Sequence, residues 1–343
     1  MNARFLQTDH LRRGFTITEL IVVIGVIAVL AGILLAAMGG VRRKAMSTRT
    51  ESTMTEFSKA CDTFQLEHGR YPGVIPEDVL ADTEVPKISG TENALLDLMG
   101  GARVSSPTFT DADFGILVGE VIDLGGGWTL KVNLDLMGAG PLINGTPYAP
   151  YFTPQDSVLV AMKSDGDSAP YPFGRQAGAP VLDRQIPELM DAWGQPIVFV
   201  RRARPSGPLA GLKTDPVQPQ FYMNSMKPYT TSAVLGEFGK DQTNQVSGSI
   251  LNAGGDNKQK PTFAQILRHP SLGSFGDAQK AQAGTARGAY ILISAGPDGI
   301  YFSRQDGPGT LKDPIDDIVA GLQEHHNPTI VKEYDDIRIF GGG

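Results

Sequence analysis

The strongest pattern in the sequence is a long apolar run close to its start. Residues 20–41 contain no charged residue, and residues 20–35 are almost entirely Ile, Val, Leu, Ala and Gly. In a helix that rises 1.5 Å per residue, about 20 such residues cross the ~30 Å hydrocarbon layer of a bilayer. Basic residues flank the run on both sides, at 12–13 and 42–44, so charge alone does not fix its orientation. The pattern predicts one membrane-spanning helix.

The helical pattern continues beyond the apolar run, but there it becomes one-sided. Apolar or small side chains recur at intervals of three and four residues: Met46, Thr50, Met54, Phe57, Cys61 and Phe64. This spacing is typical of an amphipathic helix that packs one face on a core. We therefore expect one unbroken helix from about Thr16 to His68, ended by Gly69 with Pro72 beyond it. Cys61 falls on the apolar stripe, which favours a buried hydrophobic role over a reactive thiol.

The remainder of the chain changes from helical periodicity to short β-branched and aromatic segments. Strands are expected at 128–134, 157–162, 197–202, 290–294 and 337–340, with an extended piece at 148–152 and a short helix at 93–99. Residues 203–288 are rich in Gly, Ser, Pro, Gln, Asn and Lys, which predicts an irregular, exposed insertion. The expected fold class is α+β, a long N-terminal helix packed on a small antiparallel sheet with long loops.

Composition narrows the classes of function. The formal net charge is -7, which argues against nucleic acid as a partner, and a single Cys excludes an intramolecular disulfide or a thiolate zinc cluster. We find no nucleophile elbow, P-loop, His-Glu-x-x-His or dinucleotide fingerprint, so we expect no catalytic residues and no enzyme.

Glu19 is the one acidic residue at the start of the apolar run. A carboxylate inside the hydrocarbon layer is energetically unfavourable, so an acidic residue found there is expected to have a functional role. Alternatively, Glu19 lies at the membrane interface as an N-terminal helix charge that the macrodipole favours. Position alone does not separate these two interpretations.

The residues around Glu19 carry a motif. The segment from Arg12 to Leu20, Arg-Arg-Gly-Phe-Thr-Ile-Thr-Glu-Leu, resembles the cleavage and methylation signature of type IV pilins and type II secretion pseudopilins. In that family a basic leader ends in Gly, Phe follows, and Glu is the fifth mature residue. Gly14, Phe15 and Glu19 match these positions. The resemblance implies cleavage after Gly14, N-methylation of Phe15 and a role for Glu19 in assembly.

The resemblance also implies an organisation and a location. Residues 1–14 would be the leader, 15–40 the transmembrane and filament-core helix, 41–70 the amphipathic stalk, and 71–343 a globular domain outside the cytoplasm. The expected partners are a prepilin peptidase, other pilin or pseudopilin subunits and an inner-membrane assembly platform. The chain would sit in the inner membrane with its N-terminus cytoplasmic and its C-terminal domain periplasmic, before joining a periplasmic or surface filament.

The C-terminal half carries further matches to major secretion pseudopilins. These are Asp191-Ala192-Trp193-Gly194-Gln195-Pro196, the strand and turn at 290–299, and Asp335-Asp336-Ile337. In the family this loop binds calcium, so Asp298, Asp335 and Asp336 become candidate ligands. Asp316-Asp317-Ile318 is a rival match, and the same Asp residues also suit turns and solubility.

Together these matches favour a structural subunit of a type II secretion-like filament. A type IV pilin for adhesion, motility or DNA uptake is the alternative within the family. A membrane-tethered enzyme or binding protein, which would use the helix only as an anchor, is the alternative from another class.

Overall fold

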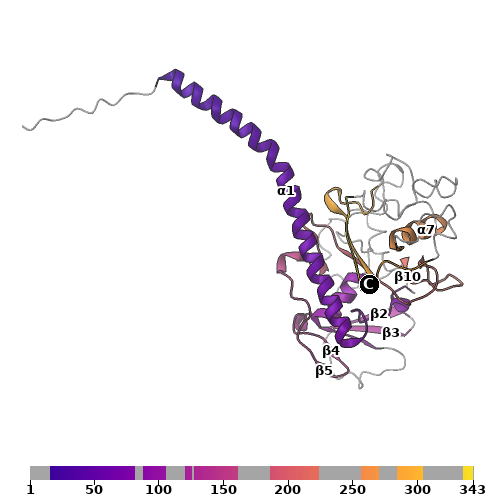
Figure 1. The fold of residues 1–343 in the computed structure, drawn as a ribbon. Helices are drawn as coiled ribbons and strands as arrows, with labels where there is room; N and C mark the ends of the chain where they lie inside the picture. Colours follow the sequence, from indigo (N-terminus) through magenta and orange to yellow (C-terminus); the bar gives the residue numbers. More distant parts are fainter. Residues whose placement is uncertain are drawn as a thin grey trace, which may run out of the picture. The chain divides into compact units, whose positions relative to one another are not determined.

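The computed structural model describes residues 16–81, 88–105, 120–125, 127–160, 186–223, 256–269, 284–303 and 335–342 (Figure 1). The chain divides into two units, Met1–Met46 and Ser47–Gly343, and each is described by itself.

One long helix, α1 (Ile17–His68), confirms the helix that the apolar and amphipathic patterns predict. No Pro interrupts it, and its first half is rich in Leu, Ala and Ile. It ends at Gly69, which has a φ of 70° and donates its N–H to the Gln65 carbonyl at 2.8 Å. A residue without a Cβ is favoured at this left-handed position, so the glycine ends the helix where the sequence predicts.

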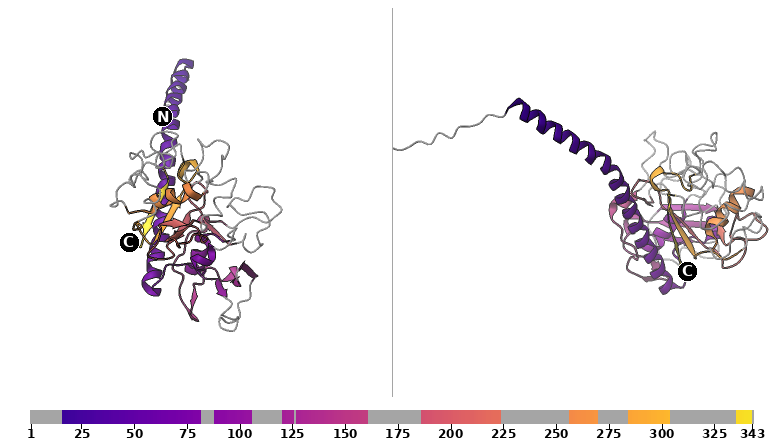
Figure 2. Two further views of the ribbon diagram at one scale, coloured as in Figure 1. Left: turned by 90° about the vertical axis from the view of Figure 1, so that its right-hand side faces the viewer. Right: turned by 45° about the horizontal axis from the view of Figure 1, so that its top comes forward.

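The central sheet joins three strands that lie far apart in the sequence. They are β8 (Val198–Arg201), β11 (Tyr290–Ser294) and β12 (Ile337–Gly341), in the order β12-β11-β8 with antiparallel pairing. Leu292 of β11 lies opposite Phe199 on one side and Ile339 on the other. All five β11 side chains are buried, as expected for a central strand. Three of the predicted strands are therefore confirmed as one sheet, beside the C-terminal half of α1 (Figure 2).

A second antiparallel sheet has the order β1-β3-β2 and was only partly expected. Its strands are β1 (Ala102–Ser105), β2 (Glu120–Gly125) and β3 (Trp128–Val132). Only β3 was predicted. The short helix α2 (Glu77–Leu80) and the predicted helix α3 (Gly90–Met99) precede this sheet. Ser89 and Glu92 form a capping box that fixes the start of α3.

Several two-residue strands complete the described elements. They are β4 (Leu142–Ile143) with β5 (Thr146–Pro147), β6 (Leu159–Val160) with β7 (Glu188–Leu189), and β9 (Ala210–Gly211) with β10 (Phe221–Tyr222). Three 3-10 turns span Leu134–Leu136, Asp156–Val158 and Gly296–Asp298. Of the strand predicted at 157–162, residues 159–160 form β6, 157–158 belong to a 3-10 turn, and 161–162 lie outside the described residues. The segment 148–152 forms no strand.

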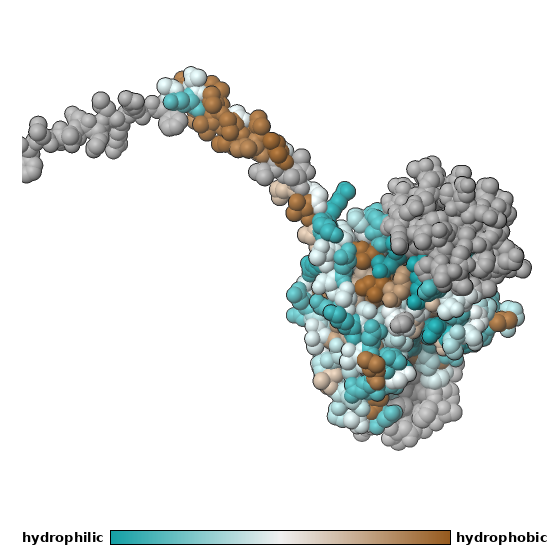
Figure 3. Space-filling view, viewed as in Figure 1, coloured by the Kyte–Doolittle hydropathy of each residue, from teal (hydrophilic) through white to brown (hydrophobic). Residues whose placement is uncertain are grey.

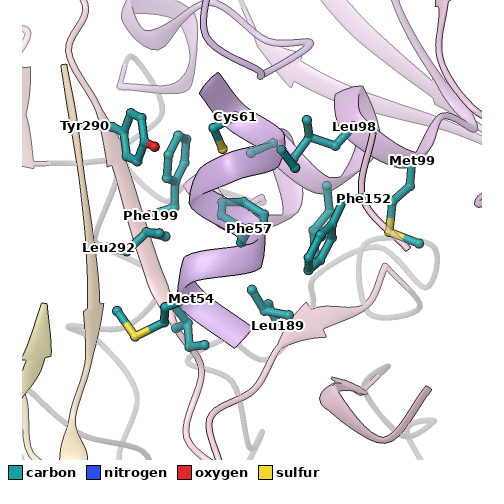
Figure 4. Packing of buried hydrophobic residues seen from close by; sticks show 14 of the residues in the cluster. Met54, Phe57, Cys61, Leu98, Met99, Phe152, Leu189, Phe199, Tyr290 and Leu292 are labelled. Atoms are coloured by element: carbon teal, nitrogen blue, oxygen red, sulfur yellow. The ribbon is translucent and has the colours of Figure 1, made fainter. Parts of the chain in front are cut away.

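The stripe on the second half of α1 forms one wall of the main core. Met54, Phe57, Cys61 and Phe64 are each 0% exposed. Phe57 meets the ring of Phe199 at 5.6 Å and, edge-on, that of Phe152 at 5.2 Å (Figure 4). The amphipathic prediction and the buried role of Cys61 are thus confirmed.

Residues 203–288 differ from the exposed insertion that their composition suggests. Their described part includes β9, β10 and the helix α7 (Asp256–Leu267). Phe221, Phe263 and Leu267 are buried and pack in one cluster with Val198 and Ile291 of the central sheet. These residues therefore belong to the core, because a few large apolar side chains outweigh a polar average composition.

Candidate functional site

The first half of α1 presents apolar side chains all round. Ile17, Leu20, Ile24, Leu30 and Ile33 are each at least 54% exposed. Figure 3 shows this surface as an almost continuous brown region. In the described part of the chain, α1 is the one helix long and apolar enough to cross a membrane. A surface of this kind is stable only in lipid or against other apolar helices.

Glu19 closes the N-terminal end of this apolar helix. Its Oε2 accepts hydrogen bonds from the Thr16 N–H at 2.9 Å and from the Thr16 hydroxyl at 2.8 Å. The Glu19 N–H in turn donates to Thr16 Oγ1 at 3.2 Å. This reciprocal pair is a capping box, which satisfies main-chain donors that the helix leaves unpaired. The carboxylate therefore lies next to the main chain that immediately follows Phe15.

Gly14 and Phe15, the predicted cleavage and methylation residues, lie outside the described residues. Of the predicted processing and assembly residues, only Glu19 is placed by the structure.

The second half of α1 is joined to the globular unit by polar contacts as well as by the core. The Tyr290 hydroxyl lies 2.7 Å from Ser58 Oγ and 3.1 Å from Asp62 Oδ1. Burial raises the pKa of Tyr290 most; the Ser58 hydrogen bond opposes this, and Cys61 and Asp62 raise the pKa further, so the phenol stays protonated and can donate. Near the start of this half, Thr50 Oγ1 accepts a hydrogen bond from the Ala192 N–H at 3.0 Å. The stalk is thus held at two points along its length, to Tyr290 of β11 and to the turn that precedes β8.

The Asp191 turn carries the second of these contacts. Its Oδ1 accepts the N–H groups of Trp193 and Gln195, and its Oδ2 accepts the Ser294 hydroxyl at 2.7 Å. Burial raises the pKa of Asp191 to about 6, against these hydrogen bonds, which lower it. The turn therefore links α1, the segment before β8 and the end of β11.

The three predicted calcium ligands lie in one region, but they have different environments. Asp336 is buried, and both its oxygens accept the Phe302 N–H, at 2.9 and 3.0 Å. Asp298 is exposed and accepts the Ile300 N–H at 2.9 Å, while Asp335 is exposed beside Gly296. Burial raises the pKa of Asp336, and the charges of Asp335 and Asp298 raise it further.

This arrangement does not by itself form a cation site. Among the described residues, no three His, Cys, Asp or Glu side chains are grouped so that they could hold a metal ion. Asp336 is buried and its carboxylate already positions the turn at Phe302, so it fits a structural role better than a ligand role. The rival pair Asp316 and Asp317 lies outside the described residues. Calcium therefore stays a prediction.

Two features of the globular unit were not singled out from the sequence. Asp191 was quoted as part of a motif, but its burial and its contact with Ser294 depend on sheet pairing across about 100 residues. The second feature is a group of arginines at 201, 202 and 204. The sequence feature that could have indicated this group is a short basic run in a chain that is acidic overall.

Comparison with known proteins gives two matches. Residues 9–35 match the family described as "Prokaryotic N-terminal methylation motif". The chain is also 33% identical, over 66 residues, to "Type II secretion system core protein G" of Pectobacterium carotovorum subsp. carotovorum. That stretch is 19% of this chain and spans only 42% of the length of that relative. No solved structure matches the chain. The two matches support the pilin and pseudopilin family and point to structural subunits, not to enzymes.

Proposed function

We propose that this chain, whose N-terminus is of the prepilin type, is a structural subunit of a type II secretion-like filament. The observation that carries the proposal is the methylation motif at residues 9–35, which contains Gly14, Phe15 and Glu19. The similarity to a type II secretion core protein favours secretion over adhesion, motility or DNA uptake.

The proposed route begins in the inner membrane. The precursor is held there by α1, with its N-terminus in the cytoplasm and residues 71–343 in the periplasm. A prepilin peptidase cleaves after Gly14, and Phe15 becomes the methylated N-terminus. An assembly platform then moves α1 from lipid into a bundle of α1 helices from other subunits. The exposed apolar surface of α1 suits this transfer, because it packs equally well on lipid and on a like surface.

Glu19 has a defined part in this route. Inside the bundle the positive charge of each Phe15 amine is removed from water, and a nearby carboxylate compensates it. The capping box holds Glu19 Oε2 at 2.9 Å from the Thr16 nitrogen, one residue from that amine. Glu19 can therefore neutralise the amine of its own chain or of a neighbour, and thereby set the axial register between subunits.

The decisive experiment separates the charge of Glu19 from its capping role. Glu19→Gln keeps a side-chain acceptor at this position of the capping box and removes the charge. Thr16→Ala keeps the charge and removes the hydroxyl that caps the helix. We expect Glu19→Gln and Glu19→Ala to be cleaved and membrane-resident but absent from filaments, and Glu19→Asp to assemble only partly.

The matched control, Thr16→Ala, should still assemble. The measurement is the fraction of mature subunit in sheared or cross-linked filaments, determined by quantitative immunoblotting. Normal assembly of Glu19→Gln would show that the charge of Glu19 is not needed and that Glu19 serves only to cap the helix. Absence of the unaltered chain from filaments would mean that α1 is only a membrane anchor.

We also propose, following the resemblance, that the C-terminal turn binds calcium. Asp298 and Asp335 are the described residues whose exposure suits a ligand role, whereas Asp336 supports the turn from within. Calcium takes six to eight oxygens, so further ligands would come from main-chain carbonyls, water or other carboxylates. A thermal melt of the full chain with calcium and with a chelator tests this. We expect the unaltered chain to have a lower melting temperature with chelator than with calcium, and Asp298→Asn to show no such difference. If the unaltered chain melts at the same temperature in both conditions, the calcium proposal is wrong.

A further inference from the structure

A cleft of about 370 Å³ opens in the globular unit where the chain leaves α1. Its walls come from residues 70–71 after the helix, from 76–78 at the start of α2, and from 201–204 at the end of β8. Four arginines lie in these walls, in a chain whose net charge is -7. A cationic cleft on an acidic chain is an unusual concentration of charge, and its hydrogen bonds show which arginines remain available.

Two of the four arginines form ion pairs within the walls of the cleft. Arg201 pairs with Glu77 at 3.0 Å and donates to the carbonyls of Tyr71 at 2.7 Å and Ile75 at 3.1 Å. Arg70 forms a two-point ion pair with Asp97. These guanidinium groups already have anionic partners, so they fix the segment after α1 against β8 and offer little to a ligand.

The other two arginines are not neutralised in this way. The Arg202 N–H donates to the Ala289 carbonyl at 2.7 Å, but its guanidinium has no hydrogen bond or ion pair within the part of the chain described. That guanidinium lies near Tyr71: burial raises the pKa of the Tyr71 phenol, and the Arg202 charge lowers it. The cleft therefore contains a guanidinium that forms no ion pair with any described residue.

Arg204 is held in place but is only partly satisfied. One of its terminal nitrogens donates to the Tyr222 hydroxyl at 2.9 Å, and its guanidinium lies 5.7 Å from the centre of the Tyr222 ring. Tyr222 in turn donates to Gln218 Oε1 at 2.7 Å, which fixes the direction of the hydroxyl. The Nε of Arg204 is buried and has no hydrogen-bond partner among the described residues. Tyr222 therefore positions the Arg204 guanidinium without neutralising it, and a positioned guanidinium with no ion pair among the described residues is the arrangement that binds a carboxylate or phosphate oxygen.

The acidic side of the cleft restricts what that anion can be. Asp78, at the start of α2, is exposed and also lines the cleft. Its charge opposes a compact dianion such as phosphate, but suits a ligand that carries N–H donors beside its carboxylate. The volume is in the range of sites for ligands much larger than a single inorganic anion. Both features favour a peptide.

We propose that this cleft binds an acidic segment of a partner polypeptide, with a carboxylate held by Arg202 and Arg204 and main-chain N–H groups facing Asp78. This goes beyond the filament function, because it assigns a recognition site to the globular unit at the exit of the stalk.

Calorimetric titration of the full chain in detergent micelles tests the proposal. The probes are a capped Gly-Glu-Gly-Glu-Gly peptide, the same peptide with Gln in place of Glu, and inorganic phosphate. We expect the acidic peptide to bind, with an affinity that falls as salt rises, and the Gln peptide not to bind. Arg202→Gln and Arg204→Gln should each weaken binding about tenfold, because each removes a charged hydrogen-bond donor.

Lys59→Gln is the matched control. It removes one positive charge from an exposed position of α1 outside the cleft, and binding should be unchanged. Because the Arg202 side chain has no partner among the described residues, we expect Arg202→Gln to have the same melting temperature as the unaltered chain. A loss of peptide binding in this variant would then not be caused by unfolding. Unchanged peptide binding by Arg202→Gln, or displacement of the peptide by equimolar phosphate, would overturn the proposal. Arg202→Gln should be cleaved as the unaltered chain is, and its filament assembly should depend on Glu19 in the same way. The peptide-binding proposal and the filament proposal can therefore be refuted independently.

Discussion

At the scale of single residues, Asp191 makes the stability of the globular unit depend on pH. It is 6% exposed, and burial raises its pKa from 3.8 to about 6. An acid with a higher pKa in the folded state takes up a proton on folding, so stability rises as pH falls from about 7 towards 4. A shift of about two units corresponds to about 3 kcal/mol between the two ends of that window.

We therefore expect Asp191→Asn to flatten the pH dependence of unfolding. Asn keeps an oxygen for the N–H groups of Trp193 and Gln195, and the Ser294 hydroxyl can rotate to accept from the new amide. The measurement is the free energy of unfolding in denaturant at pH 4.5 and pH 7.5, with the full chain in detergent. Asp135→Asn, at an exposed position, is the control and should behave as the unaltered chain does. Equal slopes for Asp191→Asn and the unaltered chain would contradict the assignment.

At the scale of elements, the second half of α1 is a structural member of the globular unit. Phe57 is 0% exposed and meets Phe152 and Phe199, whereas Leu66, two and a half turns further along the helix, is 84% exposed. The same helix therefore offers a buried and an exposed test position of similar apolar character.

We expect Phe57→Ala to destabilise the globular unit by about 3–5 kcal/mol, because it removes a buried ring and leaves a cavity. Leu66→Ala should change stability by less than about 0.5 kcal/mol, because it removes a solvated side chain. Denaturant unfolding followed by near-ultraviolet circular dichroism measures both. Similar losses for the two variants would mean that the face of the helix has been misassigned.

At the scale of the whole molecule, the proposed processing changes both the length and the charge of the chain. Residues 1–14 carry three Arg and one Asp, a net charge of +2. The formal net charge is therefore -7 for the precursor and -9 for the mature chain. Gly14→Ala should leave the full-length precursor in the membrane, because the resemblance places cleavage after this glycine. Intact-mass measurement checks it: the unaltered chain should begin at methylated Phe15, and normal processing of Gly14→Ala would place the cleavage site elsewhere.

The sequence by itself determined the elements whose signal is local. The sequence predicted the length of α1, its end at Gly69 and its buried stripe, because apolar periodicity and glycine act within a few residues. It also predicted strands at 197–202, 290–294 and 337–340, which the structure has at 198–201, 290–294 and 337–341. The strands β1 and β2 were missed, since they depend on pairing with β3 more than on their own apolar content.

Only the tertiary structure decided how distant polar groups combine. It placed Asp191 against Ser294, Asp336 under the Phe302 turn, and Arg202 and Arg204 beside the exit of the stalk. It also made part of the segment 203–288 a core element. The reason is physical: hydrogen bonding between residues far apart in the chain, 34 positions for Asp336 and Phe302 and 103 for Asp191 and Ser294, leaves no periodic trace in the sequence. An apolar helix, in contrast, repeats its hydrophobic pattern in every turn.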